Sequence, residues 1–255
     1  MMKLSLYVIT FNEEKRLRRT LEAACNLVDE IVIVDSGSTD GTEEIARFFG
    51  ARFYHNDWVS FGDQVRVAEN LCSYDWVLRL DADEELGEEL IQEIARIKEA
   101  PDCDGYKLRI GDVYPGISRP IRWAKYFKLI RLYNRKKFKM LGYLDHDAVD
   151  PVASAPRVRT LHGFVCHHSY LSLFHTIAKQ NRATDTQIQM LIKGNKTYSP
   201  ARMIGVFTLS FLRAYILHRL FLYGYWGFIN SMFIAFFRFC KFAKWYEHEQ
   251  IQKWK

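Results

Sequence analysis

The stretch VLRLDADEEL, Val77–Leu86, decides how the first half of this chain folds. A short apolar run ends in two aspartates, Asp81 and Asp83, with one alanine between them, and two glutamates follow. Carboxylates placed so close together disfavour each other's charged form unless a cation lies between or beside them. The pattern predicts a buried strand whose carboxyl end opens onto a site for a cation.

Two interpretations of these acids compete. Acidic side chains stabilise the N-terminus of a following helix, which accounts well for the glutamates of Glu84–Glu89. It accounts less well for Asp81 and Asp83, because they follow the strand directly. Mg²⁺ and Mn²⁺ prefer carboxylate oxygens together with substrate phosphates. The aspartate pair therefore predicts a divalent cation, Mg or Mn, as cofactor.

Around this stretch, strand and helix patterns alternate from Lys3 to about Ala100. Strands that are apolar throughout and joined by helices indicate a parallel sheet covered on both faces, with ligands bound at the carboxyl ends of the strands. We expect an α/β fold with a mostly parallel central sheet, and Thr10–Asn12, Asp35–Asp40 and Asp81–Glu84 along one edge. The expected strands are 4–9, 30–34, 52–54 and 76–80, and the expected helices are 13–24, 42–49, 64–72 and 88–98.

A second motif, IVIVDSGSTDGTEE, spans Ile31–Glu44. A buried strand ends in Asp35, and a Ser/Gly/Thr loop then opens a helix. Such loops let backbone amides and a helix N-terminus approach a ligand closely. Asp35 at the strand tip can accept a hydrogen bond from a nucleobase N–H. The alternative is an ordinary strand-to-helix turn, with Asp40 and Thr42 as possible N-caps.

Composition limits the class of protein. A chain of 255 residues holds one large domain, or one domain and an appendage, and its net charge of +6 suits an anionic partner. No nucleic-acid-binding motif is recognisable, so we expect no nucleic acid. The five cysteines form no CxxC pair, and the opening MMKLSLYVIT is typical of a strand. Both features favour a reducing, cytoplasmic location without a signal peptide.

Basic residues and histidines dominate the middle of the chain. Residues 113–144 contain nine Lys or Arg and no acid. Arg131 and Arg135 suit a diphosphate, and the others suit phosphorylated sugars or anionic lipid headgroups, or simply form a solvated face. The histidines of His162–His175 suggest zinc, but no recurring zinc spacing is present. We favour structural or acceptor-contacting histidines.

The C-terminal part has a different composition, rich in aromatic and aliphatic residues. Leu220–Phe237 is 18 residues long without a formal charge, with two glycines, Asn230 and Ser231 inside it and basic residues on both sides. Aromatic rings mixed with basic residues favour helices that lie in the headgroup region of an anionic membrane surface. A soluble core or oligomer contact, and a true span, are the alternatives. We expect domains at 1–200 and 201–255, the second a helical, membrane-associating extension.

Three segments, taken together, carry a resemblance: YVITFNEE, VDSGSTDGT and DWVLRLDADEEL. In this order they resemble the inverting nucleotide-sugar glycosyltransferases of family two, which have the GT-A fold. The resemblance implies that Asp35 contacts the uracil, that Asp83 is the metal ligand and that Asp81 lies near the ribose and the metal. It also implies that Thr10 and Glu13 line the nucleotide pocket.

Further segments, WVSFGDQVRVA, FKLIRLYNR, YLDHD and the aromatic tail, are similar to a narrower subgroup. Its members are lipopolysaccharide core-biosynthesis glucosyltransferases, which add a β-linked hexose to inner-core heptose. This chain departs from them at Arg66, at Asp147 in place of Glu, and at RLYNR in place of RLFRR. These departures bear on the sugar and the acceptor.

An inverting transfer needs a base for the acceptor hydroxyl. By the resemblance, Asp147 is the catalytic base, and His146 orients it, contacts the metal or touches the diphosphate. The alternative is a polar turn at these positions, with Glu84 as the second candidate for the base.

The resemblance therefore implies transfer of a hexose from a UDP-sugar, with UDP-glucose favoured, to a lipid-linked saccharide such as the lipopolysaccharide inner core. The enzyme would be peripheral to the cytoplasmic face of the inner membrane. Other donors, a capsular or other lipid-linked acceptor, and a catalytically silent sugar-nucleotide-binding scaffold are the alternatives, because a fold does not fix a function.

Overall fold

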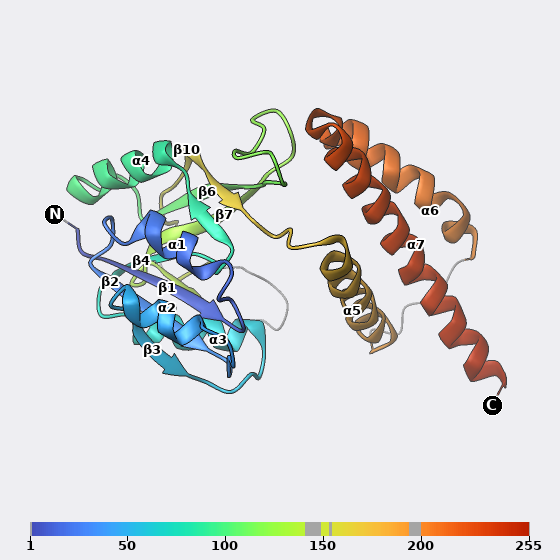
Figure 1. Ribbon diagram of the computed structural model, residues 1–255, viewed down its shortest axis with the longest axis horizontal. Helices are drawn as coiled ribbons and strands as arrows, with labels where there is room; N and C mark the ends of the chain where they lie inside the picture. The colour runs from blue at the N-terminus through green and yellow to red at the C-terminus, as the bar shows by residue number, and fades with distance from the viewer. Residues whose placement is uncertain (1, 141–148, 153–154, 194–199, 255) are drawn as a thin grey trace. The chain divides into compact units, whose positions relative to one another are not determined.

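The computed structural model describes residues 2–140, 149–152, 155–193 and 200–254 (Figure 1). The chain divides into two compact units. The first comprises Met1–Val113 and Tyr126–Ser169, and the second comprises Tyr114–Lys125 and Tyr170–Lys255. The domain boundary expected at residue 200 stays a prediction, because a compact unit need not coincide with a domain that folds alone.

One mixed sheet of eight strands organises the described part of the first unit. Its order is β3-β2-β1-β4-β7-β6-β10-β5, and β8 and β9 form a separate pair. The strands are β1 Leu4–Thr10, β2 Glu30–Asp35, β3 Arg52–His55, β4 Trp76–Arg79, β5 Glu84–Leu86, β6 Gly105–Asp112, β7 Phe127–Asn134, β8 Phe138–Met140, β9 Val149–Pro151 and β10 Val158–His167.

The predicted α/β class is confirmed, and the parallel part of the sheet lies where the sequence placed it. Strands β3, β2, β1 and β4 are parallel neighbours, as are β6 and β10. Strand β7 runs antiparallel to β4 and β6, and β5 runs antiparallel to β10. The doubly covered sheet with an antiparallel strand inserted beside β4 is the GT-A-like arrangement that the resemblance implies.

Successive side chains of a strand point to opposite faces of the sheet, so apolar strands build a core on each face. Leu4, Leu6 and Val8 of β1 belong to one apolar cluster, whereas Tyr7 belongs to the other. Helices α1, α2 and α4 contribute to the first cluster, and α3 contributes to the second. These helices are α1 Leu17–Ala24, α2 Thr42–Phe48, α3 Phe61–Leu71 and α4 Glu88–Glu99.

The acidic segment after β4 differs from the expectation. Glu84 and Glu85 lie in strand β5, and α4 begins only at Glu88. The helix-dipole interpretation is therefore wrong for Glu84 and Glu85, because these residues pair with β10, which lies some 80 residues further along the chain. The N–H of Gly87 donates to the carbonyl oxygen of Phe164 at 3.0 Å and ends this short strand.

The second unit is helical. Its elements are α5 Leu173–Lys193, α6 Pro200–Leu212, the π-helical turn η1 Arg213–Leu217, the 3₁₀ turn η2 Leu220–Tyr223 and α7 Tyr225–Trp254. Helices α6 and α7 lie side by side, and α5 also packs on α7. The uncharged stretch 220–237 is split at Gly224, which has φ 58° and separates η2 from α7. Among the described helices, none has the length and apolar character that crossing a membrane requires.

Candidate functional site

The carboxyl ends of three parallel strands meet at one edge of the sheet, as predicted. Strand β1 lies between β2 and β4, and Thr10 at its end is in register with Asp35 at the end of β2. The loops that follow are joined, because the N–H of Thr39 donates to the side-chain oxygen of Asn12 at 2.9 Å. Asn12 adopts a left-handed backbone with φ 54°, a conformation that asparagine tolerates better than most residues.

Asp35 is buried, and its carboxylate organises its own loop. One oxygen accepts the N–H groups of Gly37 at 2.8 Å and Ser38 at 2.6 Å. The other accepts the hydroxyls of Thr10 at 2.6 Å and Ser38 at 2.5 Å. These four bonds fill the acceptor sites of a carboxylate. The contact between Asp35 and a uracil stays a prediction, and it requires one of these bonds to be shared.

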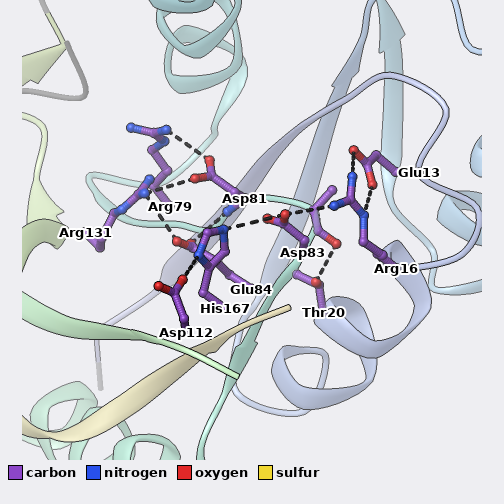
Figure 2. Close-up of polar contacts among 11 residues, drawn as sticks. Glu13, Arg16, Thr20, Arg79, Asp81, Asp83, Glu84, Asp112, Arg131 and His167 are labelled. Carbon is purple, nitrogen blue, oxygen red and sulfur yellow. Dashed lines mark hydrogen bonds and ion pairs between the residues drawn. The ribbon is translucent and has the colours of Figure 1, made fainter. Parts of the chain in front are cut away.

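Asp81 lies between two arginines (Figure 2). Arg79 donates to one carboxylate oxygen at 3.0 Å, and Arg131 donates to the other at 3.1 Å. Burial favours the neutral acid, but the charges of Arg131 and Arg79 outweigh burial and hold the pKa of Asp81 well below its usual range. Asp81 is therefore a carboxylate at neutral pH, and its side chain keeps 29% of its surface exposed.

Arg131 is shared between two acids. It is 2% exposed, and the same guanidinium nitrogen that contacts Asp81 also lies 3.4 Å from an oxygen of Glu84. Glu84 is buried as well, and its second oxygen accepts the N–H of Asp81 at 2.9 Å. The sequence suggested Arg131 as a contact for the diphosphate. In the structure its partners are the carboxylates of Asp81 and Glu84. The predicted diphosphate role stays a prediction.

Burial raises the pKa of Glu84, and the nearby Arg131 counteracts this only in part. A raised pKa suits a general base. The side chain is, however, only 2% exposed in strand β5. Glu84 therefore has little access to an acceptor hydroxyl, so the geometry favours a structural role for this second candidate.

Asp83 is held by two cationic side chains that meet on one of its oxygens. Arg16 donates to Oδ2 at 3.0 Å, and Nε2 of His167 lies 3.6 Å from the same atom. Nδ1 of His167 bonds to Asp112 at 2.8 Å. Burial disfavours the imidazolium, but the hydrogen bonds and charges of Asp112 and Asp83 outweigh it and raise the pKa of His167 to about 10. The histidine is therefore cationic and links the end of β10 to the aspartate pair.

Glu13, which the resemblance places at the nucleotide pocket, supports this arrangement from the β1–α1 loop. Its carboxylate receives a two-point contact from Arg16, at 2.6 and 2.7 Å. Arg16 in turn contacts Asp83, so these three residues form a continuous ionic chain (Figure 2). The hydroxyl of Thr20 donates to the carbonyl oxygen of Ala82 at 2.9 Å and fixes the loop between the two aspartates.

The carboxylates of Asp81 and Asp83 are ligands that suit a hard divalent cation. Within the described residues, no group of three or more His, Cys, Asp or Glu side chains is arranged to hold a metal ion. The two carboxylates nevertheless lie together after the end of β4, and both described side-chain contacts of Asp83 fall on Oδ2. Carboxylate oxygens completed by substrate phosphates are the usual way in which proteins hold Mg²⁺. Asp81 and Asp83 thus fit the predicted cofactor.

The structure also identifies residues that the sequence did not single out. No sequence motif marked Arg16 or Asp112 as site residues. Only the pairing of β6 with β10 brings Asp112 to His167. Three described histidines of the 162–175 stretch have different partners and do not converge on one point. His162 contacts Glu93, His168 contacts Glu85 and Arg19, and His167 contacts Asp112 and Asp83. Residues His146 and Asp147, the predicted base pair, lie outside the described residues.

Comparison with known proteins agrees with this geometry. The model of the family described as "Glycosyl transferase family 2" matches residues 5–158. An uncharacterised glycosyltransferase of Rickettsia typhi is 34% identical over 253 residues, which cover 96% of this chain and 87% of that protein. The lipopolysaccharide core biosynthesis glycosyltransferase LpsC of Rhizobium meliloti is 28% identical, over 98% of this chain and 94% of its own length.

The family match ends before the three C-terminal helices, whereas both relatives match across them. Among solved structures, residues 1–349 of S. aureus TarS in complex with UDP-GlcNAc superpose with a TM-score of 0.49 at 17% identity. The superposition covers 90% of this chain and 79% of that one. At this level of similarity the superposition carries no argument about the family or the function of this chain.

Proposed function

Because this chain belongs to glycosyl transferase family 2, we propose that it transfers a hexose from a UDP-sugar, with UDP-glucose favoured, to a lipid-linked saccharide. The observation that carries the proposal is the pair Asp81 and Asp83 at the carboxyl ends of parallel strands, in the edge where such sheets bind ligands. At the same edge lies the Asp35 loop, whose Gly37 and Ser38 amides donate to the carboxylate of Asp35 and hold it at the end of β2.

The proposed chemistry divides among the residues of this edge. Asp83 and Asp81 would hold a divalent cation, which would supply positive charge beside the diphosphate leaving group. Arg79 and Arg131 keep Asp81 ionised for that task, because their charges lower its pKa. Arg16 and His167 hold Asp83 in place. The acceptor hydroxyl gives its proton to Asp147, with His146 beside it, and the transfer inverts the anomeric centre.

The proposed acceptor is a lipopolysaccharide inner core or a similar lipid-linked saccharide. The Rhizobium relative LpsC is named for lipopolysaccharide core biosynthesis, which supports this class of acceptor. A capsular acceptor and a catalytically silent sugar-nucleotide-binding scaffold are the competing proposals. The pair Asp81 and Asp83 favours catalysis over a silent scaffold, because its carboxylates offer the oxygen ligands that a divalent cation takes together with a substrate diphosphate, and Asp81 keeps 29% of its side-chain surface exposed.

We also propose that the protein is peripheral to the cytoplasmic face of the inner membrane. The helical unit exposes large apolar side chains, including Leu209, Leu217 and Phe221, at 69%, 74% and 44% exposure. Basic residues accompany them in η1 and α7. Apolar and basic side chains on one helical unit suit an anionic interface.

The decisive experiment is a donor screen with the full-length protein. Hydrolysis and transfer are followed with several UDP- and GDP-sugars, with Mn²⁺ or with EDTA, and with a heptose-containing inner-core acceptor. We expect turnover of a UDP-hexose that needs both the metal and the acceptor. Binding of UDP-sugars without any turnover would favour the silent scaffold, and turnover of a GDP-sugar alone would refute the donor assignment.

A further inference from the structure

The second unit contains a polar cavity that the donor chemistry does not use. Its volume is about 430 Å³, and the side chains that line it come from α5, α6, η1, α7, the 114–125 segment and His218, which follows η1. Among the lining residues that the structure describes, none is acidic and five are basic: Lys125, Arg213, His218, Arg238 and Lys241. A concentration of one charge sign around a cavity raises the local concentration of oppositely charged ligands.

Two helices present one face each to this cavity. Thr176, Gln180, Thr184 and Gln187 recur along α5 at intervals of three or four residues. On α7 the same spacing joins Asn230, Phe233, Ile234, Phe237, Arg238 and Lys241. Residues at this spacing share one side of a helix. The cavity is therefore lined by a face of α5 that is rich in hydrogen-bonding groups and by a face of α7 that carries apolar as well as polar and basic side chains.

Buried hydroxyls complete the lining. Thr184 and Ser210 are each 4% exposed, and both line the cavity. Hydroxyl and amide groups beside arginines are the usual partners of oxyanions in proteins. The hydroxyl of Thr184 already donates to the carbonyl oxygen of Asn181 at 2.6 Å, so the lining amides of Gln180 and Gln187 add neutral donors to the charge.

Specific contacts hold the walls of the cavity in place. The N–H of Lys125 donates to the carbonyl oxygen of His218 at 3.0 Å, which ties the 114–125 segment to the end of η1. The ammonium of Lys244 donates to Thr184 at 2.9 Å and to Asp185 at 2.6 Å, which joins α7 to α5. Asp185, the acid next to the lining residue Thr184, is thereby engaged by Lys244.

The turn that carries Arg213 is unusual. Residues Arg213–Leu217 form a π-helical turn at the end of α6, and Arg219 follows in a left-handed conformation with φ 56°. Short π-helical turns occur frequently at functional sites. This turn places Arg213, Ala214 and His218 in the cavity wall.

The positive groups disfavour one another in the absence of an anion. Burial lowers the pKa of His218, and the charges of Lys125, Arg213 and Arg238 lower it further. Burial and the charge of Arg238 likewise lower the pKa of Lys241. An anion among these groups would relieve the repulsion.

We propose that this cavity binds the phosphate monoester group of a ligand. A monoester carries close to two negative charges at neutral pH and so matches several cations better than a singly charged anion does. Arginine suits phosphate because its planar donors contact two oxygens at once. The volume exceeds that of a phosphate, which leaves room for the group that it esterifies. The source is either a soluble phosphorylated molecule or a lipid headgroup that ends in a monoester.

Calorimetry on the full-length protein tests the proposal. Inorganic phosphate is titrated at constant ionic strength, with chloride as the compensating anion. We expect saturable binding, and at least about tenfold weaker binding in the double variant Arg213→Gln/Arg238→Gln, because hydrogen bonds to charged groups are the stronger ones. Arg238→Lys keeps the charge and retains part of the affinity, which separates charge loss from misfolding.

The control variant is Lys253→Gln, which removes an exposed positive charge from α7 outside the cavity lining. It should bind phosphate like the wild type. A second titration uses water-soluble dibutyryl phosphatidic acid. Tighter binding of this probe than of inorganic phosphate identifies a lipid headgroup as the source, and the reverse identifies a soluble ester. Equal phosphate affinity in the wild type and the double variant, or saturable binding of neither probe, would overturn the proposal.

Discussion

At Asp81 and Asp83 the protein keeps two neighbouring carboxylates ionised by surrounding them with cations. Arg79 and Arg131 hold Asp81, and Arg16 and His167 hold Asp83. The like-charge repulsion anticipated from the sequence is thus already balanced by side chains. A divalent cation bound here would share these carboxylate oxygens with the arginine and histidine side chains that already contact them. The metal dependence of nucleotide binding is therefore the sharpest test of the site.

We expect Asp83→Asn to remove the metal-dependent part of UDP affinity, because the amide loses the charge that attracts a hard cation. The loss should be at least about tenfold, since even indirect partners of a metal site contribute that much. Isothermal titration of UDP with Mn²⁺ and with EDTA measures it. The control is Asp75→Asn, whose half-exposed carboxylate pairs with Lys136. Equal UDP affinity in Mn²⁺ and in EDTA for the wild-type protein would contradict the metal role.

Asp29 supplies a separate prediction on stability. It pairs with Lys3 at 2.7 Å and with Lys98 at 2.8 Å, and accepts the N–H of Leu4 at 3.0 Å. Burial acts to raise the pKa of Asp29, but these contacts outweigh it and lower the pKa from 3.8 to about 2. A depressed pKa stabilises the folded state at pH values above the unfolded pKa. That contribution is lost as the pH falls from 3.8 towards about 2.

Asp29→Asn should therefore lower the free energy of unfolding at pH 7 by about 2 kcal/mol. The difference from the wild type should shrink as the pH falls below 4, because the wild-type carboxylate is then partly protonated. Urea denaturation at a series of pH values measures both effects. A difference that stays constant from pH 7 to pH 3 would rule out this ion-pair contribution.

Single residues were predicted best where they directly follow a strand. Thr10, Asp35, Asp81 and Asp83 lie where the strand pattern placed them, because the end of an apolar run is visible in the sequence. Asp112 could not be assigned a role from the sequence. Its partner, His167, is 55 residues away, and only the register of β6 with β10 joins them.

At the scale of elements, local patterns predicted local structure. All four expected strands and all four expected helices of the first hundred residues are present, with shifted ends. Helix α3 begins at Phe61, ahead of the expected start, because the hydroxyl of Ser60 accepts the N–H of Asp63 and caps it. Strand β5 was missed because three residues have no visible period, and its pairing with β10 is non-local.

In the second unit, one glycine decides how two elements pack. A Cβ atom added at Gly227 would overlap with the carbonyl oxygen of Leu220, so only glycine lets α7 approach η2. We expect Gly227→Ala to destabilise this unit by about 1–3 kcal/mol, as overpacking does. Thermal unfolding, together with the rate of proteolysis within α7, measures the effect.

Gly205→Ala in α6 is the matched control. A Cβ there would meet the side chain of Leu209 at 3.7 Å, which is ordinary contact. Alanine also favours helix over glycine by about 1 kcal/mol. This variant should therefore be as stable as the wild type or more so. If the two alanine variants unfold at the same temperature, the close approach at Gly227 does not limit packing.

At the scale of the whole molecule, the sheet edge that carries Asp35, Asp81 and Asp83 and a helical unit with exposed apolar side chains belong to one chain. The sequence predicted the first from strand and helix periods. It left the second open, because an uncharged stretch of 18 residues suits an interface, a core or a span. The structure splits that stretch at Gly224 and exposes apolar side chains on either side of the break, including Phe221 and Tyr225.

The interfacial proposal therefore predicts binding to vesicles by the intact protein. We expect sedimentation with vesicles that contain phosphatidylglycerol, and at least about tenfold weaker partitioning of Leu217→Glu, because burying a leucine side chain contributes roughly 1.5–3 kcal/mol. Val59→Glu in the first unit is the control, since Val59 is 72% exposed and Leu217 is 74% exposed. If the wild type stays in the supernatant at low salt, or if both variants bind like the wild type, the apolar surface of the helical unit has another role.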